Sequence, residues 1–168
     1  NDQLDYSFAV DGHGRILIVA NELIGRLSES LDLILKSLAI VKGSDLQGVL
    51  YAHPLFECHK PIVVGGDYIN TESGTGLVHT APGHGMDDFN TAIKNGIDIF
   101  CPVNEAGILT EEAGPFAGLN VLKDANLAII NCLNEKALLL KEVTYSHRYP
   151  YDWRTKRPTI FRATEQWF

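Results

Sequence analysis

The stretch from residue 6 to residue 20, YSFAVDGHGRILIVA, consists of two β-prone runs joined by four turn-forming residues. Residues 6–10 alternate large and small side chains, and residues 15–20 are rich in aliphatic and β-branched side chains. The connecting Asp11-Gly12-His13-Gly14 contains residues that tolerate the positive φ angles of tight turns. The stretch therefore predicts a β-hairpin.

An amphipathic helix is predicted directly after this hairpin, with Asn21 as its N-cap. The helix would cover one face of a sheet, because its apolar residues recur every three to four positions. These positions are Leu23, Leu27, Leu31, Ile34 and Leu38.

Farther along the chain, short strands and helices are mixed. We expect strands at residues 49–52, 62–64, 68–71, 77–80 and 138–140, the last of them buried. We expect helices at residues 86–94, with Phe89, Ala92 and Ile93 buried and Asn95-Gly96 as stop signal, and at residues 124–137, with Leu127, Ile130 and Leu133 along one side. Strands and helices do not alternate regularly, so the sequence predicts an α+β fold. We expect a single compact domain with one core, in which short strands form a β-barrel-like core and the helices are peripheral.

Composition excludes several classes of protein. The 168 residues are 45% hydrophobic and 21% charged, as in ordinary globular domains, and they contain neither a membrane-spanning apolar run nor a secretory signal. Three cysteines without a C-x-x-C pair argue against a disulfide framework, so we expect a cytoplasmic protein. The net charge of -7 opposes non-specific attraction to nucleic acid, although residues 146–168 carry five basic and two acidic side chains.

Residues 74–89, GTGLVHTAPGHGMDDF, gather two histidines and two aspartates among four glycines. If residues 77–80 form a strand, His79 lies on the same face as Leu77, and Asp88 falls in the first turn of the next helix, so the two could converge on one pocket. Simpler interpretations remain: the aspartates favour the helix start, and the glycines permit turns. A metal site of His79, His84, Asp87 and Asp88 is conceivable, but it lacks H-E-x-x-H spacing.

This stretch closely resembles the signature of the editing domain of bacterial-type isoleucyl-tRNA synthetases, which are class I aminoacyl-tRNA synthetases. Residues 153–168, WRTKRPTIFRATEQWF, resemble the segment by which that domain returns to the catalytic body. Tyr51-Ala52-His53-Pro54-Leu55 and Asn120-Val121 are also similar to the family. The resemblance implies that residues 1–168 are an editing-domain fragment, with about 153–168 as the return connection.

The resemblance implies hydrolysis of the ester that joins valine to the 3′ end of tRNA(Ile), with valyl-adenylate as a further candidate substrate. Isoleucyl-tRNA synthetase is itself the standard example of why such editing is needed, since one methylene distinguishes substrates by only about 1–3 kcal/mol. The implied partners are valine-charged tRNA(Ile) and the rest of the synthetase, with no membrane. Editing needs no metal or cofactor, whereas the catalytic body would use ATP and Mg²⁺.

Site residues follow from the resemblance by motif position. Asp88 would hold the substrate's α-ammonium group through a charge-assisted hydrogen bond, and His79 would limit side-chain size or position water. The backbone of Gly74, Thr75 and Gly76 would approach the terminal adenosine or the amino acid. Thr80 and His84 would support the pocket.

One feature of the family has no counterpart in this sequence. The family carries a threonine-rich segment just upstream of the matching region, and residues 1–6 do not replace it. We therefore expect little deacylation by this polypeptide alone. Two alternatives stay open: a passive tRNA-binding or interdomain module, which the basic residues 148–162 would suit, and a metal-dependent hydrolase.

Overall fold

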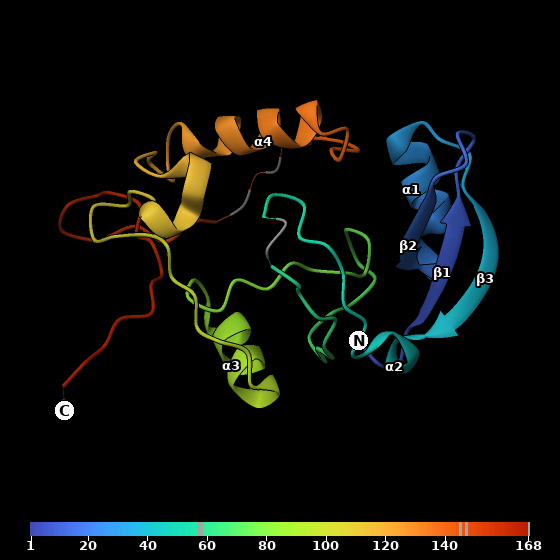
Figure 1. Cartoon of the computed structure of the whole chain (residues 1–168), viewed down its shortest axis with the longest axis horizontal. Coiled ribbons are helices and arrows are strands. Elements are labelled where there is room, and N and C mark those ends of the chain that lie inside the picture. The colour runs from blue at the N-terminus through green and yellow to red at the C-terminus, as the bar shows by residue number, and fades with distance from the viewer. Residues whose placement is uncertain (57–58, 145, 147, 168) are drawn as a thin grey trace. The chain divides into compact units, whose positions relative to one another are not determined.

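The chain is seen in a computed structural model that describes residues 1–56, 59–144, 146 and 148–167. It divides into two compact units, Asn1–His79 and Thr80–Phe168, where the sequence predicted one core. Figure 1 labels the elements of each unit along the chain. Two clusters of buried apolar side chains lie in the first unit.

The first unit is built around a three-stranded antiparallel sheet. Strand β1 (Asp5–Val10) lies between β2 (Ile16–Ala20) and β3 (Lys36–Lys42), as Figure 1 shows. The predicted hairpin is confirmed as the β1–β2 pair, in which Phe8 faces Ile18. The mixed α+β class is also confirmed. The sheet is open, however, and the β-barrel-like core is not confirmed.

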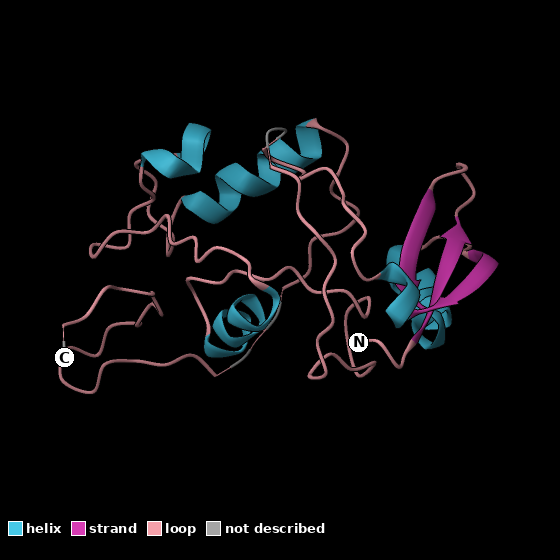
Figure 2. Ribbon diagram, turned by 60° about the horizontal axis from the view of Figure 1, so that its bottom comes forward, coloured by secondary structure: helices cyan, strands magenta, loops and turns pink. Residues whose placement is uncertain are grey.

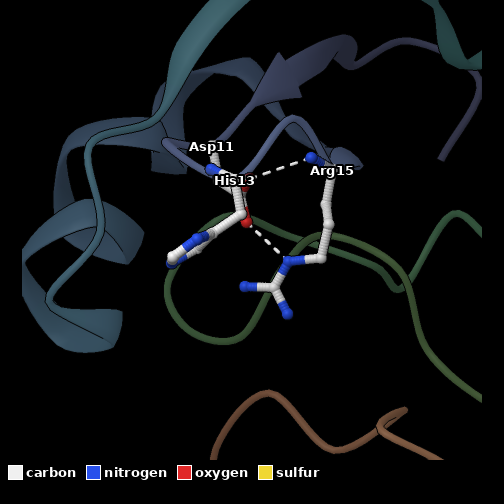
Figure 3. A network of polar contacts seen from close by, with 3 residues as sticks. All are labelled: Asp11, His13 and Arg15. Carbon is white, nitrogen blue, oxygen red and sulfur yellow. Dashed lines mark hydrogen bonds and ion pairs between the residues drawn. The ribbon is translucent and has the colours of Figure 1, made fainter.

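A buried carboxylate fixes the turn of the hairpin (Figure 3). Asp11 is only 5% exposed, and its Oδ1 accepts hydrogen bonds from the backbone N–H groups of His13 at 2.8 Å and Arg15 at 2.9 Å. Its Oδ2 accepts a third bond from Arg15 Nε at 2.6 Å. Burial opposes ionisation of Asp11, but the hydrogen bonds from Arg15 and His13 outweigh it and hold the pKa of this carboxyl below its ordinary value.

The helix after the hairpin is shorter than predicted. It consists of a 3₁₀ turn, η1 (Asn21–Leu23), followed by α1 (Ile24–Leu31), and it ends where Asp32 adopts a left-handed conformation with φ 53°. The predictions of Asn21 as N-cap and of a helix reaching Leu38 are therefore wrong: Ala20 precedes the first turn, and Leu38 lies in β3. The apolar residues beyond Asp32 match the helical period by coincidence, because the helix has already ended at Leu31.

Helices α1 and α2 (Gly43–Leu46) complete the packing of the first unit. Ile24 of α1 packs against a cluster formed by Ala9, Val19 and Leu35. The helix therefore packs against the sheet, as the sequence predicted. Leu46 of α2 joins a second cluster at the end of β1 and β2. The members of that second cluster are Tyr6, Ala20, Leu23 and Leu46.

Most of the other predicted strands of the first unit are loops. In place of strands at residues 49–52 and 62–64 there is a single bridge between Leu50 and Ile62. Residues 68–71 and 77–80 form turns and irregular backbone. Pro54 and Pro61 have no N–H group, so a continuous ladder cannot form through them. Without the predicted strand, alternation along residues 77–80 no longer assigns His79 to a face.

The second unit contains α3 (Met86–Asn95), the 3₁₀ segment η2 (Glu111–Phe116) and α4 (Ala125–Glu135). Among the described residues, every strand of the sheet lies in the first unit, as Figure 2 shows in magenta. The stop signal predicted for the first of these helices is confirmed, because Gly96 ends α3 in a left-handed conformation with φ 65°. In the described part of the chain, no helix has the length and apolar content needed to cross a membrane.

Burial in the second unit differs from the prediction at three places. On α3, Ala92 is buried as expected, but Ile93 is 62% exposed. On α4, the predicted apolar stripe includes Leu127, which is 63% exposed. Residues 138–140 are not a buried strand, since they form an irregular segment with Leu138 half exposed. In each case the apolar periodicity is real, but no described element covers these side chains.

Candidate functional site

The backbone at residues 74–76 is held against the end of β2. The Ala20 N–H donates to the Thr75 carbonyl at 2.8 Å, and the buried Tyr6 hydroxyl donates to the Gly76 carbonyl at 2.8 Å. Gly74 and Gly76 both have positive φ, 72° and 78°, which side-chain-bearing residues rarely adopt. These contacts fix the position of two of the three residues that the sequence assigned to substrate binding.

Gly76 also allows a close approach that no other residue would permit. A Cβ atom at this position would lie 2.5 Å from the Cβ of Ala20, well inside van der Waals contact. At Gly74, by contrast, a Cβ would meet no atom within 4 Å. Gly74 is therefore required for its backbone conformation, and Gly76 is required for both its conformation and the space beside Ala20.

A hollow of about 320 Å³ lies beside this backbone, within the first unit. Its volume is at the small end of the range for ligand pockets. Residues 68–70 and 73–78 line it, so Gly74, Thr75 and Gly76 all contribute. The Thr75 hydroxyl is engaged with the backbone of Leu77, donating to its carbonyl at 3.1 Å and accepting from its N–H at 3.3 Å. The Thr75 hydroxyl therefore has its partners within the loop that carries it.

His79 lies in a group of aromatic rings that the sequence did not predict. Its ring centroid is 6.0 Å from that of His53, with the two planes at 78°. His53 in turn lies 6.1 Å from His59 and 5.2 Å from Phe56. Burial, helped by the neighbouring imidazoles of His79 and His59, lowers the pKa of His53. No spacing rule connects positions 53 and 79, so the sequence offered no signal for this pair.

Asp88 bridges the loop that precedes α3. It lies in the first turn of the helix with Asp87, and its Oδ2 accepts a hydrogen bond from the Ala81 N–H at 3.0 Å. Neither aspartate is the N-cap, because that position is Gly85, which has no side chain to cap the helix. Asp88 is half-buried and Asp87 is exposed. The two neighbouring carboxylates therefore differ, and only Asp88 has a described contact outside the helix.

His84 contacts the C-terminal part of the second unit. Its Nδ1 lies 2.9 Å from the carbonyl oxygen of Phe161, which can only accept, so Nδ1 donates. In the same loop, the Gly83 carbonyl accepts from the Ala163 N–H at 2.8 Å. These two bonds tie residues 161–163 to the loop, and the predicted role of His84 in supporting the pocket stays a prediction.

The predicted site residues divide between the two units. Gly74, Thr75, Gly76 and His79 belong to the first, and Thr80, His84 and Asp88 belong to the second. The predicted convergence of His79 and Asp88 on one pocket stays a prediction. Within the described residues, no group of three or more histidine, cysteine, aspartate or glutamate side chains is arranged to hold a metal ion.

The basic C-terminal region forms a turn closed by Asp152. Its Oδ1 accepts from the backbone N–H groups of Arg154 and Thr155, and these bonds lower the pKa of this carboxyl, with Thr155 contributing most. The guanidinium of Arg154 lies 4.8 Å from the ring centroid of Trp153. Arg162 donates from Nε to the Val103 carbonyl. Part of the basic charge therefore has partners within the second unit.

Comparison with known proteins places this chain within a larger one. It is 64% identical over 168 residues, its full length, to an isoleucine–tRNA ligase of Prochlorococcus marinus (strain MIT 9313), and equally similar to one of Synechococcus sp. (strain CC9311). A ligase of Synechocystis sp. is 59% identical over 156 residues, or 93% of the chain. No family model matches the chain.

These similarities define the class first: the chain corresponds over its whole length to a segment of an aminoacyl-tRNA ligase. The chain belongs to the family of the bacterial isoleucine–tRNA ligases. The chain spans only 17% of the length of the first two relatives. The resemblance predicted from the two motifs is thereby confirmed at the level of the ligase family.

Proposed function

We propose that this chain is the editing segment of an isoleucine–tRNA ligase and hydrolyses the ester of valine attached to the 3′ end of tRNA(Ile). The observation that carries the proposal is the match of the complete chain, editing motif included, to these ligases. A synthetic site that selects isoleucine cannot strongly reject an amino acid smaller by one methylene, so a second, hydrolytic site has a physical purpose. Its partners are charged tRNA(Ile) and the rest of the ligase.

The backbone at residues 74–76 supports this proposal, since it supplies a rigid wall beside a hollow of modest size. The wall is fixed by Ala20 and Tyr6 and cannot retreat without breaking two hydrogen bonds of 2.8 Å. A rigid wall can exclude a larger side chain, whereas a mobile one would adjust to it. We infer that this wall contacts the terminal adenosine or the aminoacyl group.

Hydrolysis of an activated ester requires little beyond orientation. A water oxygen attacks the ester carbonyl, the bond from the acyl carbon to the ribose oxygen breaks, and the ribose oxygen takes a proton released by the water to become a hydroxyl, giving free valine and tRNA. In our proposal, the Asp88 carboxylate binds the α-ammonium group and so fixes the carbonyl relative to the attacking water. His79 limits the size of the side chain or positions that water.

A charge substitution in the complete ligase tests this proposal. Asp88→Asn keeps an oxygen that can accept from the Ala81 N–H, and it removes the negative charge. We expect the variant to accumulate Val-tRNA(Ile) while charging isoleucine at the normal rate. Asp87→Asn is the matched control, because this exposed neighbour lies in the same helical turn, and it should clear Val-tRNA(Ile) normally.

The result also separates the alternatives. If Asp88→Asn clears Val-tRNA(Ile) as fast as the unsubstituted ligase, the editing role of this carboxylate is wrong. A passive tRNA-binding module predicts weaker tRNA affinity without mischarging, and a metal-dependent hydrolase predicts loss of deacylation on treatment with a chelator.

A further inference from the structure

The ring of His53 is held in one protonation state by the backbone beside it. Its Nδ1 lies 3.1 Å from the N–H nitrogen of Leu55 and 3.2 Å from that of Phe56. Both groups are donors, so Nδ1 must offer its lone pair and cannot carry a proton. The geometry therefore defines a neutral imidazole with its proton on Nε2.

The same ring lies edge-on to His79. The two centroids are 6.0 Å apart and the planes meet at 78°, which is the arrangement that places the positive edge of one ring against the negative face of the other. His53 is half-buried and His79 is exposed. The half-buried ring, fixed by two backbone bonds, is thus in a position to hold the exposed ring.

We propose that His53 is a positioning residue for His79: its fixed, uncharged ring orients the His79 imidazole at the editing site. This proposal rests on the editing function proposed above. The backbone favours a neutral ring at position 53, because protonation of Nδ1 would break the hydrogen bonds from the Leu55 and Phe56 N–H groups. The lowered pKa of His53, caused first by burial, agrees with this state.

Asparagine at position 53 separates the two roles of the residue. Its Oδ1 can replace Nδ1 as acceptor for the two backbone N–H groups, but it has no ring to contact His79. If His53 only shapes the turn, His53→Asn should behave normally. If His53 also positions His79, the variant should fold and still lose part of the editing activity.

The first measurement is the NMR chemical shift of His79 in the 168-residue chain, which does not depend on catalysis. We expect His53→Asn to move the His79 Cε1–H resonance, because the ring-current contribution disappears. His13→Asn is the matched control: it removes an imidazole from the hairpin turn, where the His13 N–H donates to Asp11, and it should leave the His79 resonance in place. An unchanged His79 resonance in His53→Asn would overturn the proposed contact.

The second measurement is deacylation of Val-tRNA(Ile) by the complete ligase. We expect His53→Asn to lower the maximal rate by about 2- to 10-fold with little change in KM, which is the scale of one aromatic pair. A shifted resonance with an unchanged rate would refute the positioning role while leaving the ring contact intact. If the unsubstituted ligase does not deacylate Val-tRNA(Ile), the proposed function itself is wrong, and the NMR result stands apart from it.

A further pair of variants covers the case in which His53→Asn does not fold. His53→Phe keeps a ring and loses the Nδ1 acceptor, whereas His53→Ala loses both. We expect the phenylalanine variant to edit faster than the alanine variant, because it retains the surface that supports His79. Equal rates in the two variants would contradict the proposal.

Discussion

Substitution of Gly76 by alanine tests how the wall of the candidate site is held. The position has φ 78°, where a side-chain-bearing residue costs about 1–2 kcal/mol. The added methyl group would also lie 2.5 Å from the Cβ of Ala20, a residue that is fully buried, and overpacking of this kind costs about 1–3 kcal/mol. Together these terms predict a loss of about 2–5 kcal/mol in the free energy of unfolding.

Gly74→Ala provides a control two residues away. Its φ is 72°, so it pays the same conformational cost, but its methyl group would meet no atom within 4 Å. We therefore expect a loss of only about 1–2 kcal/mol. The difference between the two variants isolates the contact with Ala20, since the backbone conformation and the added group are the same.

Urea denaturation followed by far-UV circular dichroism measures both losses. With a slope of about 2 kcal/mol per molar urea, the midpoint should fall by about 1–2.5 M for Gly76→Ala and by about 0.5–1 M for Gly74→Ala. Amide hydrogen exchange should show the larger loss of protection in β1 and β2, where Tyr6 and Ala20 bond to the wall. Equal midpoints in the two variants would refute the close approach at Gly76.

Two further predictions concern other fixed points of the fold. Gly83→Ala should destabilise the second unit by about 1–3 kcal/mol, because its Cβ would lie 2.9 Å from the Cα of Cys101. Gly85→Ala is the control, since its Cβ would make only ordinary van der Waals contacts. Equal thermal midpoints for the two variants would contradict this prediction. Asp11→Asn should lower the thermal midpoint at pH 7. Since the folded pKa of Asp11 lies below its unfolded value, this stabilisation is present above about pH 4 and is lost as the pH falls through the folded pKa, so the gap from the unsubstituted protein should narrow in acid. A constant gap from pH 7 to pH 2 would show that the Asp11 charge contributes nothing.

Local signals predicted the elements that depend on neighbouring residues. The hairpin follows from β-prone runs on either side of a turn that spans residues 11–15, one residue longer than predicted, and Gly96 ends α3 because glycine adopts the left-handed conformation easily. Both require only interactions within a few positions of the chain. The α+β class could therefore be predicted from local signals, whereas the ligase family was predicted from the resemblance of two motifs.

Long-range partners could not be predicted in the same way. Strand β3 pairs with β1 from about 30 residues away, and the apolar residues Ile34 and Leu38 fit a helical period although they lie in a loop and a strand. A one-sided apolar pattern says which side chains avoid water, but not which element covers them. For this reason the exposed Leu127 of α4 was predicted on a packed face.

The candidate site shows the same limit at the level of single residues. Motif position predicts Gly76 and Asp88 as site residues, but it did not reveal that Gly76 packs on Ala20 or that Asp88 accepts from the Ala81 N–H. Each residue therefore has a structural contact beside its proposed role in editing. An alanine substitution would remove both at once, and a loss of activity would have two explanations.

Substitutions that keep one contact and remove the other resolve this ambiguity. Asp88→Asn preserves an acceptor for the backbone and removes the charge that would bind the ammonium group, so mischarging by this variant would report on the charge. His53→Asn follows the same logic, because it keeps the acceptor for Leu55 and Phe56 and removes the ring beside His79. If both variants keep their fold and both accumulate Val-tRNA(Ile), the retained backbone hydrogen bonds do not account for the roles of these two side chains in editing.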